Sequence, residues 1–169
     1  MFEIGTLVIY GSEGVCKILD VELKAFFNSN ELKEYYVLEP QDNKQSKLFV
    51  PVDGENVHKK MQPMLSYEEI VELINDDTEI EWIVDNKQRS KYYTEVFKKY
   101  DRRMIIALAR CLYGIKNGKL LNIKRLFSID EEMLKKITQA LFIEFSYVMK
   151  IEQEQVLPFI NKEIMIDKK

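Results

Sequence analysis

The residue pattern of the chain changes near Pro63. Before that residue, short runs rich in β-branched and aromatic side chains alternate with turn residues, which is typical of β-strands. After it, apolar residues recur every three or four positions, which is typical of amphipathic helices. A chain whose strands all precede its helices does not build interleaved βαβ units. The sequence of 169 residues therefore predicts an α+β protein with a sheet followed by helices.

The first part of the chain reads as four short strands separated by turn residues. Glycine, asparagine, aspartate and serine gather between the strands, as hairpin connections require. Four or five antiparallel strands at this spacing curl into a small barrel, so residues 1–62 predict an antiparallel Tudor-like or SH3-like β barrel. The expected strands are Thr6 to Tyr10, Val15 to Val21, Glu34 to Pro40 and Lys47 to Val52, with turns at residues 11–14, 28–30 and 41–44.

Two serine-to-glutamate pairs mark expected helix starts in the second part. In a capping box, a serine hydroxyl and a glutamate carboxylate three residues later satisfy backbone N–H groups at the start of a helix. Ser66-x-x-Glu69 opens a short helix, which we expect to bridge the domains within the segment 63–85. Ser128-x-x-Glu131 opens a long helix that runs through Val148.

The remaining helices are expected from about residue 86 to 100 and from about residue 103 to 117. A tail helix should begin or kink at Pro158, because proline lacks the N–H that a helix interior uses. Residues 86–169 thus predict an all-α helical bundle.

Charge is distributed unevenly along the chain, although the net charge is only -3. Residues 61–85 hold 8 acidic side chains and no lysine or arginine, whereas residues 86–127 hold 12 basic side chains and only Glu95 and Asp101 as acids. Clustered basic side chains gain free energy by displacing the counterions condensed on nucleic-acid phosphates. The basic block therefore favours a nucleic-acid partner over the alternative of a solvated helix face.

The helix expected at 86–100 separates two kinds of side chain. At 100° per residue, its aromatic and aliphatic residues share one face and its lysines share the opposite face, which Arg102 continues. Such a helix can pack its aromatic side and still present a cationic stripe. The lysines of the stripe are Lys87, Lys91 and Lys98.

Trp82 is the sole tryptophan and lies between the acidic and the basic segments. Most tryptophans are largely buried, and the spacing alone favours a core role for this one. The alternative is an apolar wedge of the kind that minor-groove proteins insert against base steps.

The sequence lacks the usual parts of a catalytic or metal site. His58 is the sole histidine, with no second histidine or cysteine pair nearby, and no phosphate-binding loop, nucleophile elbow or zinc-protease motif is present. Cys16 and Cys111 are expected as small buried hydrophobes. We expect no enzyme activity, no metal and no cofactor.

The longest apolar run, Met104 to Ala109, is far shorter than the ~20 residues of a membrane span. No secretion signal is recognisable at the N-terminus. We therefore expect a soluble, cytoplasmic protein without a membrane partner.

Several motifs carry a family resemblance. The patterns Phe2-x-Ile4-Gly5-x-x-Val8-x-Tyr10, Gly14-Val15-x-x-Ile18, Glu34 to Leu38 and Phe49 to Val52 resemble the bacterial CarD-like transcription regulators and the polymerase-interacting domain of transcription-repair coupling factors. No helicase motifs follow, which favours the stand-alone regulator. The resemblance continues through Arg89, Tyr93, Asp101, Leu112-Tyr113 and Leu134 to Leu141, so it spans about residues 1–150.

The resemblance implies two binding surfaces. The barrel would pair edge-to-edge with a strand of the RNA polymerase β subunit, through Lys24, Phe49 and Pro51, with Phe49 standing where family members have a basic residue. The helical domain would hold promoter DNA at the upstream edge of the bubble, largely independently of sequence, with a tryptophan as minor-groove wedge. That tryptophan falls near Asn86, one helical turn beyond Trp82. The DNA-binding candidates are Trp82, Asn86, Lys87, Arg89, Lys91, Lys98, Arg102 and Lys136.

Two alternatives stay open at this point. An RNA-binding or ribosome-associated factor would use the same basic block, and a protein-protein adaptor would use only the β domain. None of these readings requires a small-molecule substrate.

Overall fold

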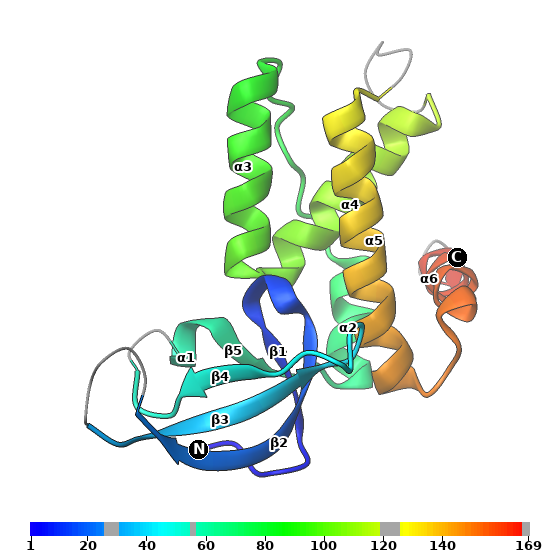
Figure 1. Cartoon of the computed structure of the whole chain (residues 1–169). Helices are drawn as coiled ribbons and strands as arrows, with labels where there is room; N and C mark the ends of the chain where they lie inside the picture. Colours follow the sequence, from blue (N-terminus) through cyan, green and yellow to red (C-terminus); the bar gives the residue numbers. More distant parts are fainter. Residues whose placement is uncertain (26–30, 55–56, 119–125, 167–169) are drawn as a thin grey trace. The chain divides into compact units, whose positions relative to one another are not determined.

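The computed structural model divides into two compact units, Met1–Met64 and Leu65–Lys169 (Figure 1). It describes residues 1–25, 31–54, 57–118 and 126–166, and the side chains of these residues except 58, 59 and 161–166. The first unit carries an antiparallel sheet and the second is helical, so the predicted α+β class is confirmed. The turn expected at residues 28–30 lies outside the described part of the chain.

The first unit is built on a five-stranded antiparallel sheet with the strand order β4-β3-β2-β1-β5. All four predicted strands are confirmed, and β5 and the one-turn helix α1 are additions that were too short to predict. Among the described residues, the end strands β4 and β5 do not pair with each other, so the expected closure of a barrel is not seen. The elements are β1 Leu7–Tyr10, β2 Val15–Lys24, β3 Lys33–Pro40, β4 Leu48–Pro51, α1 Val57–Lys60 and β5 Met61–Pro63.

One side of this sheet holds the core of the unit. Alternation along the strands brings Val8, Cys16, Ile18, Tyr36, Leu38 and Val50 together with Val57 and Met61. The connection from β1 to β2 turns through a short 3₁₀ segment, Gly11–Glu13, and needs Gly14 at a φ of 67°, which glycine adopts without a steric cost. Cys16 is buried and unbridged, as expected, and burial raises the pKa of its thiol to about 12.

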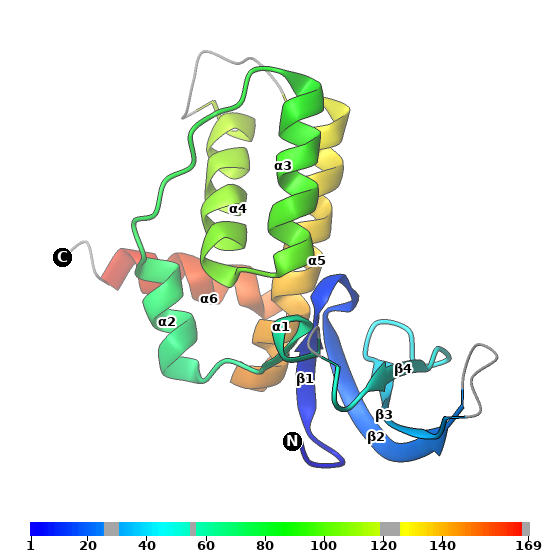
Figure 2. The ribbon, with the colours of Figure 1, turned by 90° about the vertical axis from the view of Figure 1, so that its left-hand side faces the viewer.

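The second unit is a set of helices in which α3, α4 and α5 run alongside one another, while α6 packs against α5 and α2 (Figure 2). Apolar side chains at helical spacing form its core, including Tyr93, Leu108, Leu112, Ile137 and Phe145. Three of the helices were predicted to within two residues at each end. The elements are α2 Tyr67–Asn75, α3 Asn86–Lys99, α4 Arg102–Lys116, α5 Ser128–Met149 and α6 Gln153–Ile166.

The first capping box is confirmed and the second is wrong. The Glu69 N–H donates to Ser66 Oγ at 3.2 Å, and the Ser66 N–H donates to Glu69 Oε2 at 2.7 Å. At α5 the cap residue is Phe127, whose N–H donates to the Asp130 carboxylate at 3.1 Å. Because the helix begins at Ser128 itself, the serine is already inside the first turn.

Two further expectations about the helical part need correction. The helix α2 packs against α4, α5 and α6 and belongs to the second unit, so it is not a separate bridge. The tail helix starts at Gln153 and continues past Pro158. The buried Val156 anchors this helix two residues before the proline, so packing holds its course although the proline ring removes one backbone donor.

Candidate functional site

The candidate polymerase-binding residues lie on the sheet of the first unit. Lys24 Nζ sits 3.8 Å from the centroid of the Phe49 ring and 2.8 Å from Glu22 Oε2, so β2 and β4 meet through a cation-π contact. The Lys24 side chain is 35% exposed. Pro51 pairs with Tyr35 at the end of β4, which is an edge strand of the sheet. The structure thus brings Lys24 and Phe49 together and places Phe49 and Pro51 on an edge.

The helix α3 presents its lysines to solvent. Lys87, Lys91 and Lys98 are exposed, and within the described residues none of them makes an ion pair. The helix is capped by Asp85, whose carboxylate accepts a hydrogen bond from the Gln88 N–H at 2.8 Å. Glu95 is exposed one turn after Lys91, so the cationic face is interrupted by one acid.

Lys136 adds a cation from a second helix. It lies on α5, is exposed, and its Nζ is 4.3 Å from the centroid of the buried Phe97 ring of α3. The ammonium group therefore covers an aromatic side chain of α3 while it stays open to solvent.

Arg102 is not part of the exposed stripe. Its side chain is 10% exposed, and its Nε lies 2.9 Å from Oε1 of Glu144, which is fully buried. Burial raises the pKa of Glu144, and the positive charge of Arg102 partly offsets that rise. The guanidinium neutralises a carboxylate of the same unit, which disfavours the DNA contact predicted at Arg102.

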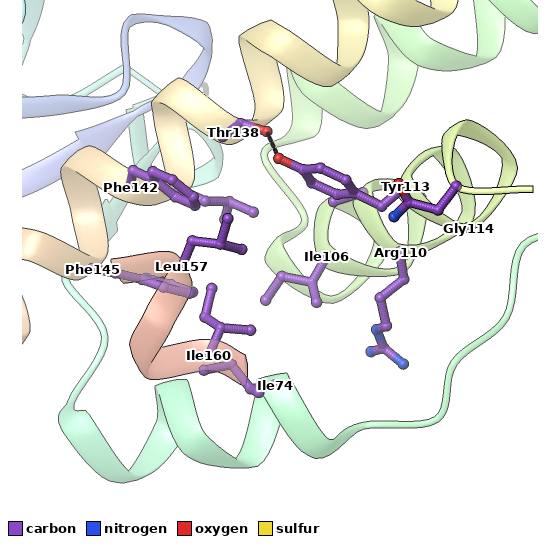
Figure 3. A pocket seen from close by; sticks show the side chains of 13 residues that line it. Ile74, Ile106, Arg110, Tyr113, Gly114, Thr138, Phe142, Phe145, Leu157 and Ile160 are labelled. Carbon is purple, nitrogen blue, oxygen red and sulfur yellow. Dashed lines mark hydrogen bonds between the residues drawn. The ribbon is translucent and has the colours of Figure 1, made fainter. Parts of the chain in front are cut away.

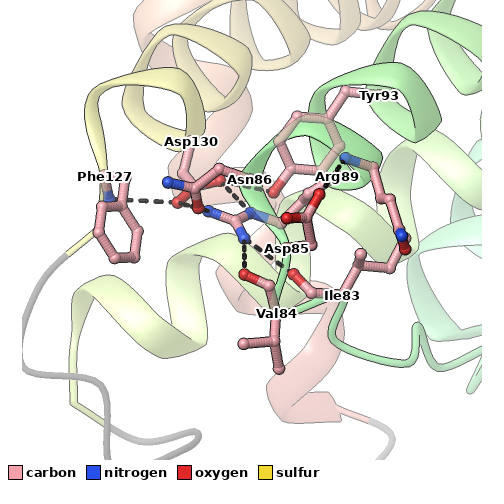
Figure 4. Close-up of polar contacts among 9 residues, drawn as sticks. Ile83, Val84, Asp85, Asn86, Arg89, Tyr93, Phe127 and Asp130 are labelled. Atoms are coloured by element: carbon pink, nitrogen blue, oxygen red, sulfur yellow. Dashed lines mark hydrogen bonds and ion pairs between the residues drawn. The ribbon is translucent and has the colours of Figure 1, made fainter.

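Arg89 is the most deeply buried cation of the unit, with 1% exposure. Its guanidinium has five N–H donors, and each has an acceptor (Figure 4). Nε donates to Asp130 Oδ1 at 2.8 Å, and Nη2 donates to Asp130 Oδ2 at 3.1 Å. The remaining donors reach the carbonyl oxygens of Ile83 and Val84 at 2.8 and 3.1 Å and the Asn86 Oδ1 at 2.8 Å.

The carboxylate of Asp130 also has all its hydrogen-bonding positions filled. Besides Arg89, it accepts a hydrogen bond from the Tyr93 hydroxyl at 2.8 Å and from the Phe127 N–H at 3.1 Å. A carboxylate offers about four acceptor positions, so its hydrogen-bonding capacity is filled. Burial and the bond to Asp130 raise the pKa of Tyr93 well above its ordinary value. We call Arg89, Asp130, Tyr93 and Asn86, with the backbone groups that they bind, the Arg89 cluster.

The Arg89 cluster fixes the position of residues 83–86, because Arg89 binds the backbone carbonyls of Ile83 and Val84. Every donor of the Arg89 guanidinium is used inside the unit, which disfavours the DNA contact predicted at this residue. Asn86 is exposed but turns its side-chain oxygen toward Arg89. The Trp82 ring lies 4.4 Å from the Arg89 guanidinium carbon and is half-buried. Trp82 is thus stacked against the Arg89 cluster, and its role as a wedge stays a prediction.

Sequence reasoning missed the two carboxylates that bind the buried arginines. Asp130 lies one turn before Leu134, and Glu144 lies three residues after Leu141, so both occupy the apolar stripe of α5. A charged side chain at such a position is buried only when it is paired. Arg89 lies one turn before Tyr93 on the apolar face of α3. A charged residue on the apolar face of a helix was therefore the sequence feature that could have predicted these buried pairs.

The class of the protein follows from its first unit. Residues 2–65 match the model of the family described as the CarD-like/TRCF RID domain. The match covers the sheet-bearing unit and ends one residue beyond it. Residues 2–65 therefore carry the domain that CarD-like proteins share with transcription-repair coupling factors, as the motifs of this part of the chain predicted. No curated protein matches the chain.

The match supports a role in transcription and an interaction with RNA polymerase. The described residues contain no group of three or more histidine, cysteine, aspartate or glutamate side chains placed to hold a metal ion. No helix in the described part of the chain is both long and apolar enough to cross a membrane.

Proposed function

We propose that this protein regulates transcription by binding the RNA polymerase β subunit and promoter DNA together. The β unit binds polymerase by adding its edge strand β4 to a strand of the β subunit. The exposed lysines of α3 and Lys136 of α5 hold the phosphates near the upstream edge of the bubble and change the lifetime of the open complex. The family match over residues 2–65 supports the first contact.

The observation that carries the DNA contact is the row formed by Lys87, Lys91 and Lys98 on α3, which are exposed and make no ion pair among the described residues. Three arginines of the basic block, Arg89, Arg102 and Arg103, are paired with carboxylates, so the cationic surface is smaller than the sequence indicated. A surface of a few lysines binds DNA weakly, with a Kd of about 10⁻⁴ to 10⁻⁶ M. Attachment to polymerase supplies the effective concentration that such a contact needs.

Charge reversal on α3 tests this proposal. Lys87→Glu with Lys91→Glu should abolish DNA retention, and in the salt titration of the unsubstituted protein the two lysines should account for about two units of the slope of log K against log salt. Adding a cation to the same face with Glu95→Lys should strengthen retention. Fluorescence anisotropy with duplex DNA measures all three proteins.

The matched control is Lys44→Glu with Lys47→Glu, which makes the same charge change at two exposed positions of the first unit. It should leave DNA affinity unchanged. The α3 variant should still bind the isolated polymerase β lobe in a pull-down. Equal DNA retention by the α3 variant and the unsubstituted protein would rule out the DNA contact, and preference for an RNA competitor would favour the RNA-binding alternative.

A further inference from the structure

The helical unit has a partly open cavity of about 390 Å³ between α2, α4, α5 and α6 (Figure 3). Its walls are mostly aliphatic and aromatic side chains, among them Ile106, Leu141, Phe142, Phe145, Leu157 and Ile160. Sites for small molecules measure about 300–1,000 Å³ and are lined in the same way, with a small number of polar groups. The cavity is thus large enough for a ligand with a sizeable apolar part.

Arg110 of α4 supplies a cation at this cavity. Its Nε and Nη2 atoms are buried and have no hydrogen-bond partner within the described part of the chain. Leaving such donors unsatisfied costs free energy, and native proteins rarely accept that cost without a reason. Figure 3 shows Arg110 and Ile106 extending from α4 side by side, one helical turn apart.

Asp76, the carboxylate near Arg110, binds other groups. Asp76 accepts a hydrogen bond from the Thr78 N–H at 2.9 Å and lies 3.0 Å from Nη1 of Arg103. The pKa of Asp76 is lowered first by its hydrogen bonds to Thr78, then by Arg103, and least by Arg110. Among the described residues, Arg110 therefore has no ion-pair partner of the kind that Arg89, Arg102 and Arg103 have.

The other polar groups at the wall are neutral. The Tyr113 hydroxyl and Thr138 Oγ1 face each other at 3.4 Å, and Asn117 lines the end of α4. An inorganic anion would satisfy Arg110 but leave the apolar walls unused, and a cationic ligand would be repelled. The combination of one guanidinium with apolar walls fits a molecule with a single carboxylate and an apolar tail.

We propose that the helical unit binds a medium-chain fatty acid, with the carboxylate on Arg110 and the acyl chain between α4, α5 and α6. A carboxylate accepts the two unused donors in a fork geometry that lysine cannot match. The proposal is independent of the polymerase and DNA contacts. A ligand bound in the helical unit could regulate the protein.

Isothermal titration of the full chain with decanoate, below its micelle concentration, tests the proposal. Decanoate should bind, decanol should bind about tenfold more weakly, and decyltrimethylammonium should not bind. Arg110→Met keeps the side-chain length but removes the charge, so it should weaken decanoate binding about tenfold and leave decanol binding unchanged. Lys116→Met, a charge loss at an exposed position of the same helix, should change neither.

A second variant locates the ligand. Ala109→Leu reduces the volume of the cavity and should weaken decanoate and decanol alike. No decanoate binding, or equal binding of decanoate and decanol, overturns the proposal even if a variant fails to fold, because both measurements use the unsubstituted protein. Decanoate binding that is unaffected by folded Arg110→Met and Ala109→Leu variants places the ligand elsewhere and also overturns it.

Discussion

The described part of the helical unit contains two buried pairs of arginine and carboxylate, and they differ in how completely the polar groups around them are hydrogen-bonded. In the Arg89 cluster, every donor of the arginine and every acceptor position of Asp130 is used. In the second pair, Arg102 meets the buried Glu144 at 2.9 Å, and the nearby Tyr100 hydroxyl is buried without a hydrogen-bond partner within the described residues. The Glu144 carboxylate accepts hydrogen bonds from Arg102 and from the Leu65 backbone, so the two pairs carry the same charges and differ in the tyrosine hydroxyl beside each of them.

This difference gives the two pairs different physical roles. A buried ion pair with all its hydrogen bonds made fixes one arrangement, whereas a buried hydroxyl without a partner beside the second pair costs free energy. The Arg89 cluster joins the segment 83–86 to α3 and to the start of α5, so it sets where Trp82 stands. Burial raises the pKa of Glu144 above its ordinary value.

Removing the charge of Asp130 should give the largest effect. In Asp130→Asn, the amide NH₂ must replace one oxygen, and each oxygen accepts two hydrogen bonds, so the NH₂ faces two donors in either orientation. Arg89 is left buried without its counter-charge, and we expect a loss of about 3–5 kcal/mol in the free energy of unfolding. Chemical denaturation followed by circular dichroism measures this.

Glu131→Gln is the control for Asp130→Asn, because Glu131 is the exposed neighbour in the same helical turn. It should change the free energy of unfolding by no more than about 0.5 kcal/mol. An Asp130→Asn variant as stable as the control would mean that the hydrogen bonds of the Arg89 cluster contribute little, and the contrast between the two pairs would disappear.

The two buried tyrosines give a matched test of intermediate size. Tyr93→Phe removes a donor to Asp130 and should cost about 1–3 kcal/mol, since the bond is to a buried charge. Tyr100→Phe removes a hydroxyl that has no partner among the described residues, so it should be neutral or stabilising by up to about 1 kcal/mol. The difference in denaturation midpoint between the two variants measures the contrast directly. Equal losses would show that Tyr100 also has a partner, for instance an ordered water.

The sequence predicted the regular elements of the fold well because their signals are local. Period-two runs marked β1 to β4, and three-to-four spacing marked α3, α4 and α5 to within two residues. The short elements α1 and β5 were missed, since three or four residues carry no period. The closure of the sheet is not seen among the described residues, and strand spacing alone does not determine which edge strands pair.

The candidate site was predicted less well because a charged residue's partner lies far along the chain. Lys87, Lys91 and Lys98 are on the surface as their helical face required. Arg89 and Arg102 share the same stretch of basic residues, but their carboxylate partners are 41 and 42 positions away, at Asp130 and Glu144. Counting charges within a segment therefore overestimates the cationic surface wherever the tertiary fold supplies a distant acid.

The pH dependence of the contribution that Glu144 makes to the free energy of unfolding gives the smallest and most specific test of the contrast between the two buried pairs. Its folded-state pKa lies above the ordinary value of 4.5, so the folded protein binds this proton more tightly than the unfolded chain does. The resulting stabilisation is fully present below pH 4.5 and is lost as the pH rises through the raised pKa. Glutamine cannot ionise, so in Glu144→Gln this contribution does not change with pH.

The free energy of unfolding of the unsubstituted protein minus that of Glu144→Gln should therefore fall as the pH rises above 4.5. Urea denaturation at a series of pH values measures the difference, in which the titrations of all other carboxylates cancel. The change should be small because Arg102 opposes the effect of burial. A difference that instead increases with pH would mean that the ion pair with Arg102 outweighs burial, and the two buried pairs would then differ in location alone.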